Sequence, residues 1–101
     1  MVRERTLYYV YVLKSLKDQK NYTGSTDFVL KRLKEHNAGK TESTKRRRPL
    51  ELLYHESYNT REEAEQRETY LKSGKGREEL KDILRGAIDP PPSGILLKER
   101  E

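Results

Sequence analysis

Apolar and aromatic positions gather in three short runs that predict β-strands. Residues 7–13 contain only leucine, valine and tyrosine, and such a run is typical of a strand that is covered on both faces of a sheet. A shorter run over residues 21–24 ends at a glycine, and a third covers residues 50–56. The polar residues 15–20 predict a turn that folds the first two runs into a β-hairpin.

Three segments between and after these runs have apolar residues at helical spacing: residues 27–36, 60–72 and 77–85. Residues 25–27 are Ser, Thr and Asp, which supply candidate N-caps for the first helix. Thr60 and Glu63 have the spacing of a capping box at the start of the second helix. Residues 73–76 include two glycines and predict a break before the third helix.

The order strand, strand, helix, strand, helix, helix predicts a small α+β domain, in which helices flank an antiparallel three-stranded sheet. We expect this single domain to span residues 1–85, followed by a proline-rich tail over residues 86–101. Three consecutive prolines favour an extended tail, and its apolar residues 95–97 offer a docking surface on the same domain, a second copy or another protein. Residues 98–101 are expected to be disordered.

Each of the first two helices carries a polar residue on its apolar stripe. Val29, Leu33 and His36 share one face of the first helix, and Arg32 lies one turn before the histidine. On the second helix, Glu68 falls between two apolar positions of the stripe. A carboxylate that faces inward costs several kcal/mol unless a cation or hydrogen bonds satisfy it. Such exceptions to the apolar pattern indicate a functional site.

Two tyrosines of the predicted hairpin, Tyr11 and Tyr22, are expected side by side on one face of the sheet. Taken singly, every one of these residues has an ordinary interpretation: sheet packing for the tyrosines, a surface charge for Arg32, satisfaction of helix carbonyls for His36 and a solvated ion pair for Glu68. Together they contain a metal ligand, a phosphate-binding group and several proton carriers.

Composition narrows the class of protein. The chain has 101 residues, of which 32% are hydrophobic and 39% charged, so its core must be small. The absence of cysteine excludes disulfides and thiolate metal sites, and two histidines are too few for a histidine-rich metal centre. No apolar run approaches the roughly 18 residues that span a bilayer, and the N-terminus lacks a secretory signal. We therefore expect a cytoplasmic protein without membrane contact.

The net charge of +5 favours a polyanionic partner such as nucleic acid. Two basic segments, one after the first helix and one at the end of the second, are suited to contact a phosphate backbone. Their candidate nucleic-acid-binding residues are Lys45, Arg46, Arg47, Arg48, Lys72, Lys75 and Arg77.

In their order and spacing, these motifs resemble the GIY-YIG nuclease family over residues 7–84. Residues 9–11 stand where the family has Gly-Ile-Tyr, and residues 22–24 where it has Tyr-Ile-Gly. Arg32 and His36 match its Arg-x-x-x-His helix motif, and Glu68 matches its metal-binding glutamate. The pattern is similar to the short stand-alone bacterial branch, which is related to the nuclease domain of the excision-repair endonuclease subunit.

The chain departs from the family pattern at three places. Tyr9 replaces the first glycine, at a structural position where this branch tolerates it. The asparagine that many relatives carry near the end of the domain has no clear counterpart, so no role is transferred to a C-terminal asparagine. Lys45 is aligned only loosely with a basic or histidine residue of the family.

The resemblance implies a metal-dependent DNA endonuclease of low sequence specificity, or one selective for DNA structure, in repair or recombination. Glu68 would bind Mg²⁺ or Mn²⁺ as the only protein ligand, and Arg32 would hold a phosphate oxygen. Either Tyr11 or Tyr22 would take a proton from the attacking water, with His36 receiving or orienting that proton. Two alternatives remain: a nucleic-acid-binding module of the same fold without useful activity, and a component that is active only with a partner.

Overall fold

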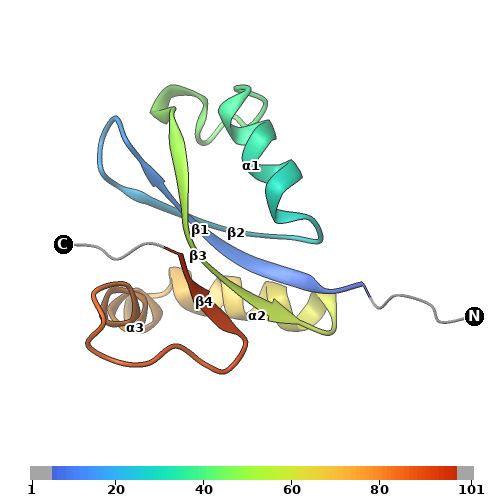
Figure 1. The fold of residues 1–101 in the computed structure, drawn as a ribbon, viewed down its shortest axis with the longest axis vertical. Helices are drawn as coiled ribbons and strands as arrows, with labels where there is room; N and C mark the ends of the chain where they lie inside the picture. Colours follow the sequence, from blue (N-terminus) through green and yellow to red (C-terminus); the bar gives the residue numbers. More distant parts are fainter. Residues whose placement is uncertain (1–5, 98–101) are drawn as a thin grey trace, which may run out of the picture.

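A four-stranded antiparallel sheet forms the centre of the computed structural model, which describes residues 6–97 (Figure 1). The strands lie in the order β2-β1-β3-β4 and comprise β1 (Tyr8–Ser15), β2 (Asn21–Thr26), β3 (Leu50–Tyr58) and β4 (Gly94–Leu96). The helices are α1 (Val29–Asn37), the short 3-10 helix η1 (Lys45–Arg47), α2 (Arg61–Lys72) and α3 (Gly74–Leu84). The predicted α+β class and antiparallel pairing are confirmed, as is the relative order of the six predicted elements, β1, β2, α1, β3, α2 and α3.

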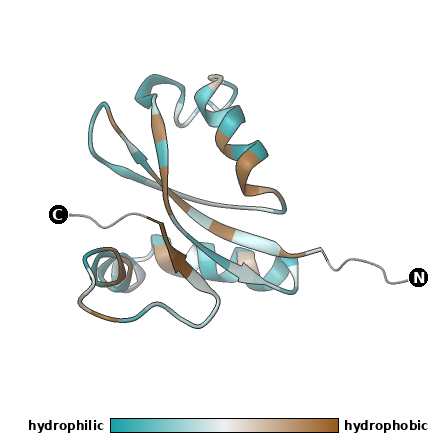
Figure 2. Ribbon diagram, in the orientation of Figure 1, coloured by the Kyte–Doolittle hydropathy of each residue, from teal (hydrophilic) through white to brown (hydrophobic). Residues whose placement is uncertain are grey.

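Helices cover both faces of the sheet. In Figure 1, α1 lies on one side of the central strands, and α2 and α3 lie on the other. A small cluster around Tyr11 and Leu13 faces α1, whereas the larger core around Val10 and Val12 faces α2 and α3. In Figure 2, brown apolar bands alternate with pale bands along β1. The two clusters confirm that the strand is covered on both faces.

The hairpin between β1 and β2 is closed by a turn over residues 16–20. The Ser15 hydroxyl accepts hydrogen bonds from the backbone N–H groups of Lys17 and Asp18, each at 3.1 Å. Gln19 adopts a left-handed conformation with φ of 64°. The pairing places Tyr11 opposite Gly24 and Leu13 opposite Tyr22. The predicted turn is thus confirmed, although β2 continues to Thr26.

The prediction of three strands was wrong, because the C-terminal segment adds β4 to the sheet. Leu96 pairs with Tyr54, and Ile95 pairs with His55. Residues 94–96 of the predicted tail therefore belong to the sheet. The boundary at residue 85 stays a prediction, and residues 98–101 lie outside the described part of the chain.

Helix termini agree with the sequence only in part. The Thr60 hydroxyl accepts a hydrogen bond from the Glu63 N–H and caps α2 as predicted. In contrast, α1 begins after Phe28 and has no side-chain cap, so the caps expected at residues 25–27 do not form. The predicted break at residues 73–76 is limited to Ser73, whose hydroxyl caps α3. Helix α3 therefore begins at Gly74, three residues before the predicted start at residue 77. Within residues 6–97, no helix is both long and apolar enough to cross a membrane.

Candidate active site

Tyr11 and Tyr22 lie next to each other on the side of the sheet that faces α1. Their ring centroids are 6.2 Å apart, as the hairpin register requires. Gly24 makes this arrangement possible, because a Cβ atom at that position would lie 2.6 Å from Tyr11 Oη. The expectation of two neighbouring phenols is met, and Gly24 provides the space for the Tyr11 ring.

His36 is fully buried beneath the two tyrosines. Its Nε2 atom lies 2.9 Å from Tyr11 Oη, and its Nδ1 atom lies 2.7 Å from Thr44 Oγ1. The Tyr22 ring packs edge-on against the imidazole at a centroid distance of 5.0 Å. Both ring nitrogens are thus engaged by side chains rather than by helix carbonyls. The stripe on α1 positions a histidine for a hydrogen-bonded chain from Tyr11 to Thr44.

Burial controls the protonation of this chain. Burial lowers the pKa of His36 below its ordinary value, and the positive charge of Arg32 lowers it further, so the imidazole is neutral at pH 7. Burial raises the pKa of Tyr11 to about 12, although the neighbouring Arg32 guanidinium opposes this shift. Both groups therefore rest in their uncharged forms, and Arg32 is the nearby group that favours a phenolate.

Arg32 occupies a partly exposed position on α1. Its Nη1 atom donates a hydrogen bond to Glu35 Oε1 at 3.2 Å, an ion pair between residues one turn apart. Because the pair is open to solvent, it holds the guanidinium only weakly. Arg32 is available to an anion that approaches the tyrosines.

Glu68 reaches the same region from α2, around the edge strand β2. Its Oε1 atom accepts a hydrogen bond from the Ser25 hydroxyl at 2.7 Å, and its Oε2 atom accepts one from Lys72 Nζ at 2.6 Å. The negative charge of Glu68 contributes to raising the pKa of Tyr11. The carboxylate and the phenol therefore share one electrostatic environment, although they come from opposite sides of the sheet.

The surroundings of Glu68 are compatible with a hard divalent cation. The carboxylate and the Ser25 hydroxyl are oxygen donors, and a cation bound at Oε2 would replace the Lys72 ammonium group that lies there. Within residues 6–97, no group of three or more His, Cys, Asp or Glu side chains is arranged to hold a metal ion. Fewer than three such side chains of the described residues would therefore hold a cation at Glu68.

Sequence reasoning missed two residues of this site, Ser25 and Thr44. Both are hydroxyl side chains, and each contacts a residue that the sequence did single out, Glu68 or His36. The sequence shows only that Thr44 precedes four consecutive charged residues; its full burial is visible in the structure alone. Ser25 offers none beyond its place after Gly24.

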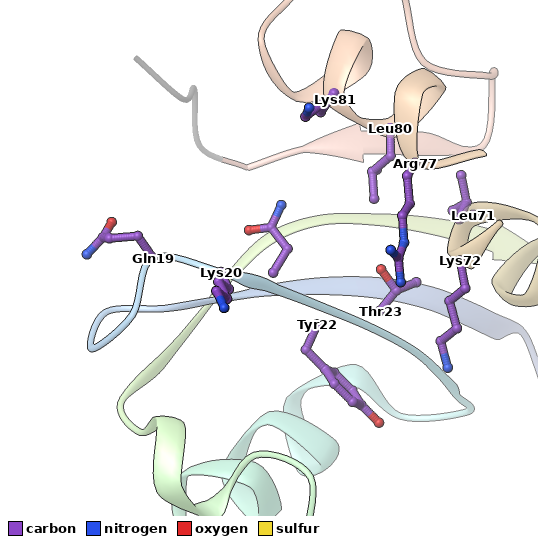
Figure 3. Close-up of a pocket in the computed structure, with 10 residues that line it drawn as sticks. Gln19, Lys20, Tyr22, Thr23, Leu71, Lys72, Arg77, Leu80 and Lys81 are labelled. Atoms are coloured by element: carbon purple, nitrogen blue, oxygen red, sulfur yellow. The ribbon is translucent and has the colours of Figure 1, made fainter. Parts of the chain in front are cut away.

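The predicted basic residues divide into two groups in space. Around η1, Lys45 pairs with Glu42 and Arg47 pairs with Asp18, each at 3.0 Å, while Arg48 donates to backbone carbonyls. Arg46 belongs to the same loop and lines a shallow depression with Lys45 and Arg48. Lys72 and Arg77, by contrast, line a groove between β2 and the helices α2 and α3, to which Lys75 does not contribute (Figure 3).

Comparison with known families identifies the arrangement. The model of the GIY-YIG catalytic domain matches residues 7–81. The chain belongs to the GIY-YIG family. This membership confirms the resemblance drawn from the tyrosine, arginine and glutamate motifs. The GIY-YIG catalytic domain is that of a family of endonucleases, and its members generally use divalent metal ions.

Bacterial GIY-YIG relatives of similar size bear the name UPF0213. A UPF0213 protein of Staphylococcus haemolyticus is 43% identical over 77 residues, which cover 75% of this chain and 93% of the relative. The YazA protein of Bacillus subtilis is 46% identical over 70 residues, or 68% of this chain and 70% of that protein. A solution structure of a UPF0213 protein from Bacillus halodurans covers 76% of this chain and 84% of its own, with 35% identity and a TM-score of 0.47.

Proposed function

We propose that this protein is a metal-dependent endonuclease that hydrolyses phosphodiester bonds in DNA. The observation that carries the proposal is the hydrogen bond between Tyr11 Oη and His36 Nε2, beside Arg32 and within the electrostatic influence of Glu68. In a GIY-YIG domain this set contains the groups that phosphodiester hydrolysis needs: a proton acceptor, a cation for the phosphate and a carboxylate for a metal ion.

Tyr11, rather than Tyr22, is proposed as the phenol that accepts the proton of the attacking water. Among the described contacts of the two phenols, the hydrogen bond to the imidazole is made by the Tyr11 hydroxyl. In the tautomer that we propose, Tyr11 donates to the lone pair of Nε2, and Nδ1–H donates to Thr44 Oγ1. As Tyr11 takes a proton from the water, it passes its own proton to Nε2 of His36, so the imidazole carries the positive charge. Tyr22 orients the imidazole through its edge-on contact.

Arg32 and Glu68 are proposed to act on the phosphate. The planar guanidinium of Arg32 would hold a non-bridging oxygen in place of its exposed contact with Glu35. Glu68 would hold Mg²⁺ or Mn²⁺ through its carboxylate, with Ser25 fixing the orientation of Oε1. A divalent cation in this position supplies positive charge that stabilises the negative charge developing on the phosphate.

A cleavage assay with Glu68→Gln tests the proposal. Wild-type protein should nick supercoiled plasmid in Mg²⁺ or Mn²⁺, and EDTA should abolish the nicking. We expect Glu68→Gln to lower the rate by about 10³-fold, because several kcal/mol of charge stabilisation is lost and about 1.4 kcal/mol corresponds to a factor of ten. The matched control is Glu65→Gln, an exposed carboxylate on the same helix, which should retain the full rate.

The second candidate is a DNA-binding module without useful activity. It is favoured by the Lys72 ammonium group, which already neutralises Glu68, and by the raised pKa of Tyr11. Binding of DNA without any metal-dependent nicking of plasmid, flap or branched substrates would support this candidate and contradict the proposal. Selectivity for DNA structure, a role in repair or recombination, the cytoplasmic location and contacts with a second copy or partner stay predictions.

A further inference from the structure

A groove of about 430 Å³ runs between the edge strand β2 and the helices α2 and α3, next to the proposed active site (Figure 3). It adjoins that site at two residues. Tyr22 belongs to the stretch of β2 that forms one wall, and its ring projects from the strand toward α1. Lys72 lines the opposite wall and donates a hydrogen bond to Glu68. A strand bound at the active site would have its neighbouring nucleotide at this groove.

Positive charge dominates the groove. Its titratable lining residues are Lys20, Tyr22, Lys72, Arg77 and Lys81. The carboxylates of the described residues form no ion pair with Lys20, Arg77 or Lys81, whereas Lys45 and Arg47 around η1 are ion-paired. In Figure 3, the Arg77 side chain extends from α3 toward Thr23 of β2. Unpaired cations that converge on one concave surface are suited to a phosphate.

The groove also contains an unsatisfied amide. The Oδ1 atom of Asn21 is buried and has no hydrogen-bond partner within residues 6–97, although Asn21 is one of the lining residues. A buried carbonyl oxygen without a partner costs about 1–3 kcal/mol, so its position calls for a donor from a ligand. Leu71 and Leu80 also line the groove, but only 1% and 6% of their surface is exposed. The amide oxygen is therefore the group in this groove that is suited to the edge of a nucleobase.

We propose that this groove binds a single unpaired nucleotide next to the phosphate that is cut. The inference rests on the proposed nuclease function and adds its substrate class. Lys20, Arg77 and Lys81 bind the backbone phosphate, and Asn21 accepts a hydrogen bond from the base. The volume lies in the range of about 300–1,000 Å³ that is typical of small-molecule sites, so it suits one nucleotide and not a duplex. A paired base cannot enter, because its edge and faces are already occupied.

Equilibrium binding in EDTA, where no cleavage occurs, tests this inference. Fluorescence anisotropy would compare a labelled single-stranded oligodeoxynucleotide with a blunt hairpin of the same length. We expect wild-type protein to bind the single strand about tenfold more tightly, since one charge-assisted contact and one amide hydrogen bond together account for about 1.4 kcal/mol or more. Asn21→Leu should remove most of this preference, while the circular dichroism spectrum stays unchanged and the thermal midpoint does not fall.

A second variant keeps the test decisive if Asn21→Leu does not fold. Arg77→Gln should weaken single-strand binding several-fold and reduce the slope of log K against log salt by about 0.7. The matched control is Lys40→Gln, which removes an exposed cation at the end of α1, outside the groove, and should change neither the preference nor the slope by a comparable amount. Equal binding of the two oligonucleotides by wild type, or equal effects of Arg77→Gln and Lys40→Gln, would overturn the inference.

Failure of the subsite and failure of the nuclease proposal have different signatures. Glu68→Gln protein should keep the single-strand preference, because the groove does not use that carboxylate. If the preference is present and no DNA is cut, the nuclease proposal fails and the subsite stands. If wild type cuts DNA with no preference for an unpaired nucleotide at the cut, the subsite fails and the nuclease proposal stands.

Discussion

Two clusters of tyrosine, arginine and carboxylate side chains lie at different places on the sheet and differ in how completely they are paired. Between β3 and the helices α2 and α3, Glu56 is fully buried. Its carboxylate accepts hydrogen bonds from the hydroxyls of Tyr54 and Tyr58 and from Nε and Nη2 of Arg67. Arg67 also donates to Glu79. The cluster is closed, since each charged group has an opposite charge and each phenol has an acceptor.

The cluster around Tyr11 is open by comparison. Its buried part, from Tyr11 through His36 to Thr44, is uncharged. Its charged members are ion-paired at partly exposed positions, Arg32 with Glu35 and Glu68 with Lys72. An incoming anion can replace Glu35, and an incoming cation can replace Lys72. Similar residue types thus stabilise the fold in the Glu56 cluster, where every group is paired inside the protein. In the Tyr11 cluster the charged groups are held by weak ion pairs, so they are available for chemistry.

The largest expected effect on stability tests the closed cluster. Glu56→Ala should lower the free energy of unfolding by about 3–5 kcal/mol, because two phenols lose their acceptor and Arg67 loses its buried partner and keeps only Glu79. Glu68→Ala should cost no more than about 1 kcal/mol, because its ion pair with Lys72 is open to solvent. Urea denaturation measures both values, and equal losses would contradict the comparison.

A smaller effect is expected where the hairpin supports the open cluster. Gly24→Ala would place a methyl group 2.6 Å from Tyr11 Oη, so the phenol must shift away from His36. We expect a loss of about 1–3 kcal/mol in stability together with a loss of plasmid nicking. Gly74→Ala is the matched control, because no atom lies within 4 Å of a Cβ at that position in α3. Retention of full nicking by Gly24→Ala would show that the Tyr11 contact is dispensable.

The smallest effect concerns pH. Since folding lowers the pKa of His36 below the ordinary value of about 6.5, the unfolded chain takes up a proton first as the pH falls. The contribution of His36 to stability is therefore complete above pH 6.5 and is lost as the pH falls through the lowered value in the folded protein. The slope is at most about 1.4 kcal/mol per pH unit for each such histidine.

Urea midpoints between pH 5 and pH 8 check this expectation. His36→Gln should reduce the acid dependence but not remove it, because burial also lowers the pKa of His55. His55→Gln provides the matched comparison on β3, because His55 pairs with Tyr11 across the strands while the Tyr11 hydroxyl bonds His36. An unchanged slope in His36→Gln would mean that the imidazole is not held neutral by the fold.

Arg67 and Glu68 illustrate how far the sequence reaches. They are consecutive on α2, yet Arg67 enters the closed cluster and Glu68 turns to the edge of β2. Helical spacing indicates that Glu68 shares a face with apolar residues, and this local rule needs only the 3.6-residue period. It does not say which strand the face meets, because that depends on how the sheet is ordered. The partners Glu56 and Ser25 are therefore visible only in the folded chain.

Local patterns in the sequence predict the hairpin, the cap of α2, the inward position of His36 and the order of motifs of a GIY-YIG domain. These features follow from alternation, helical period and capping chemistry, which act over a few residues. Tertiary structure alone decided that residues 94–96 complete the sheet, that Thr44 lies against His36 and that Arg47 pairs with Asp18. Each of these contacts joins segments far apart in the chain, where the path of the backbone and not local propensity selects the partner.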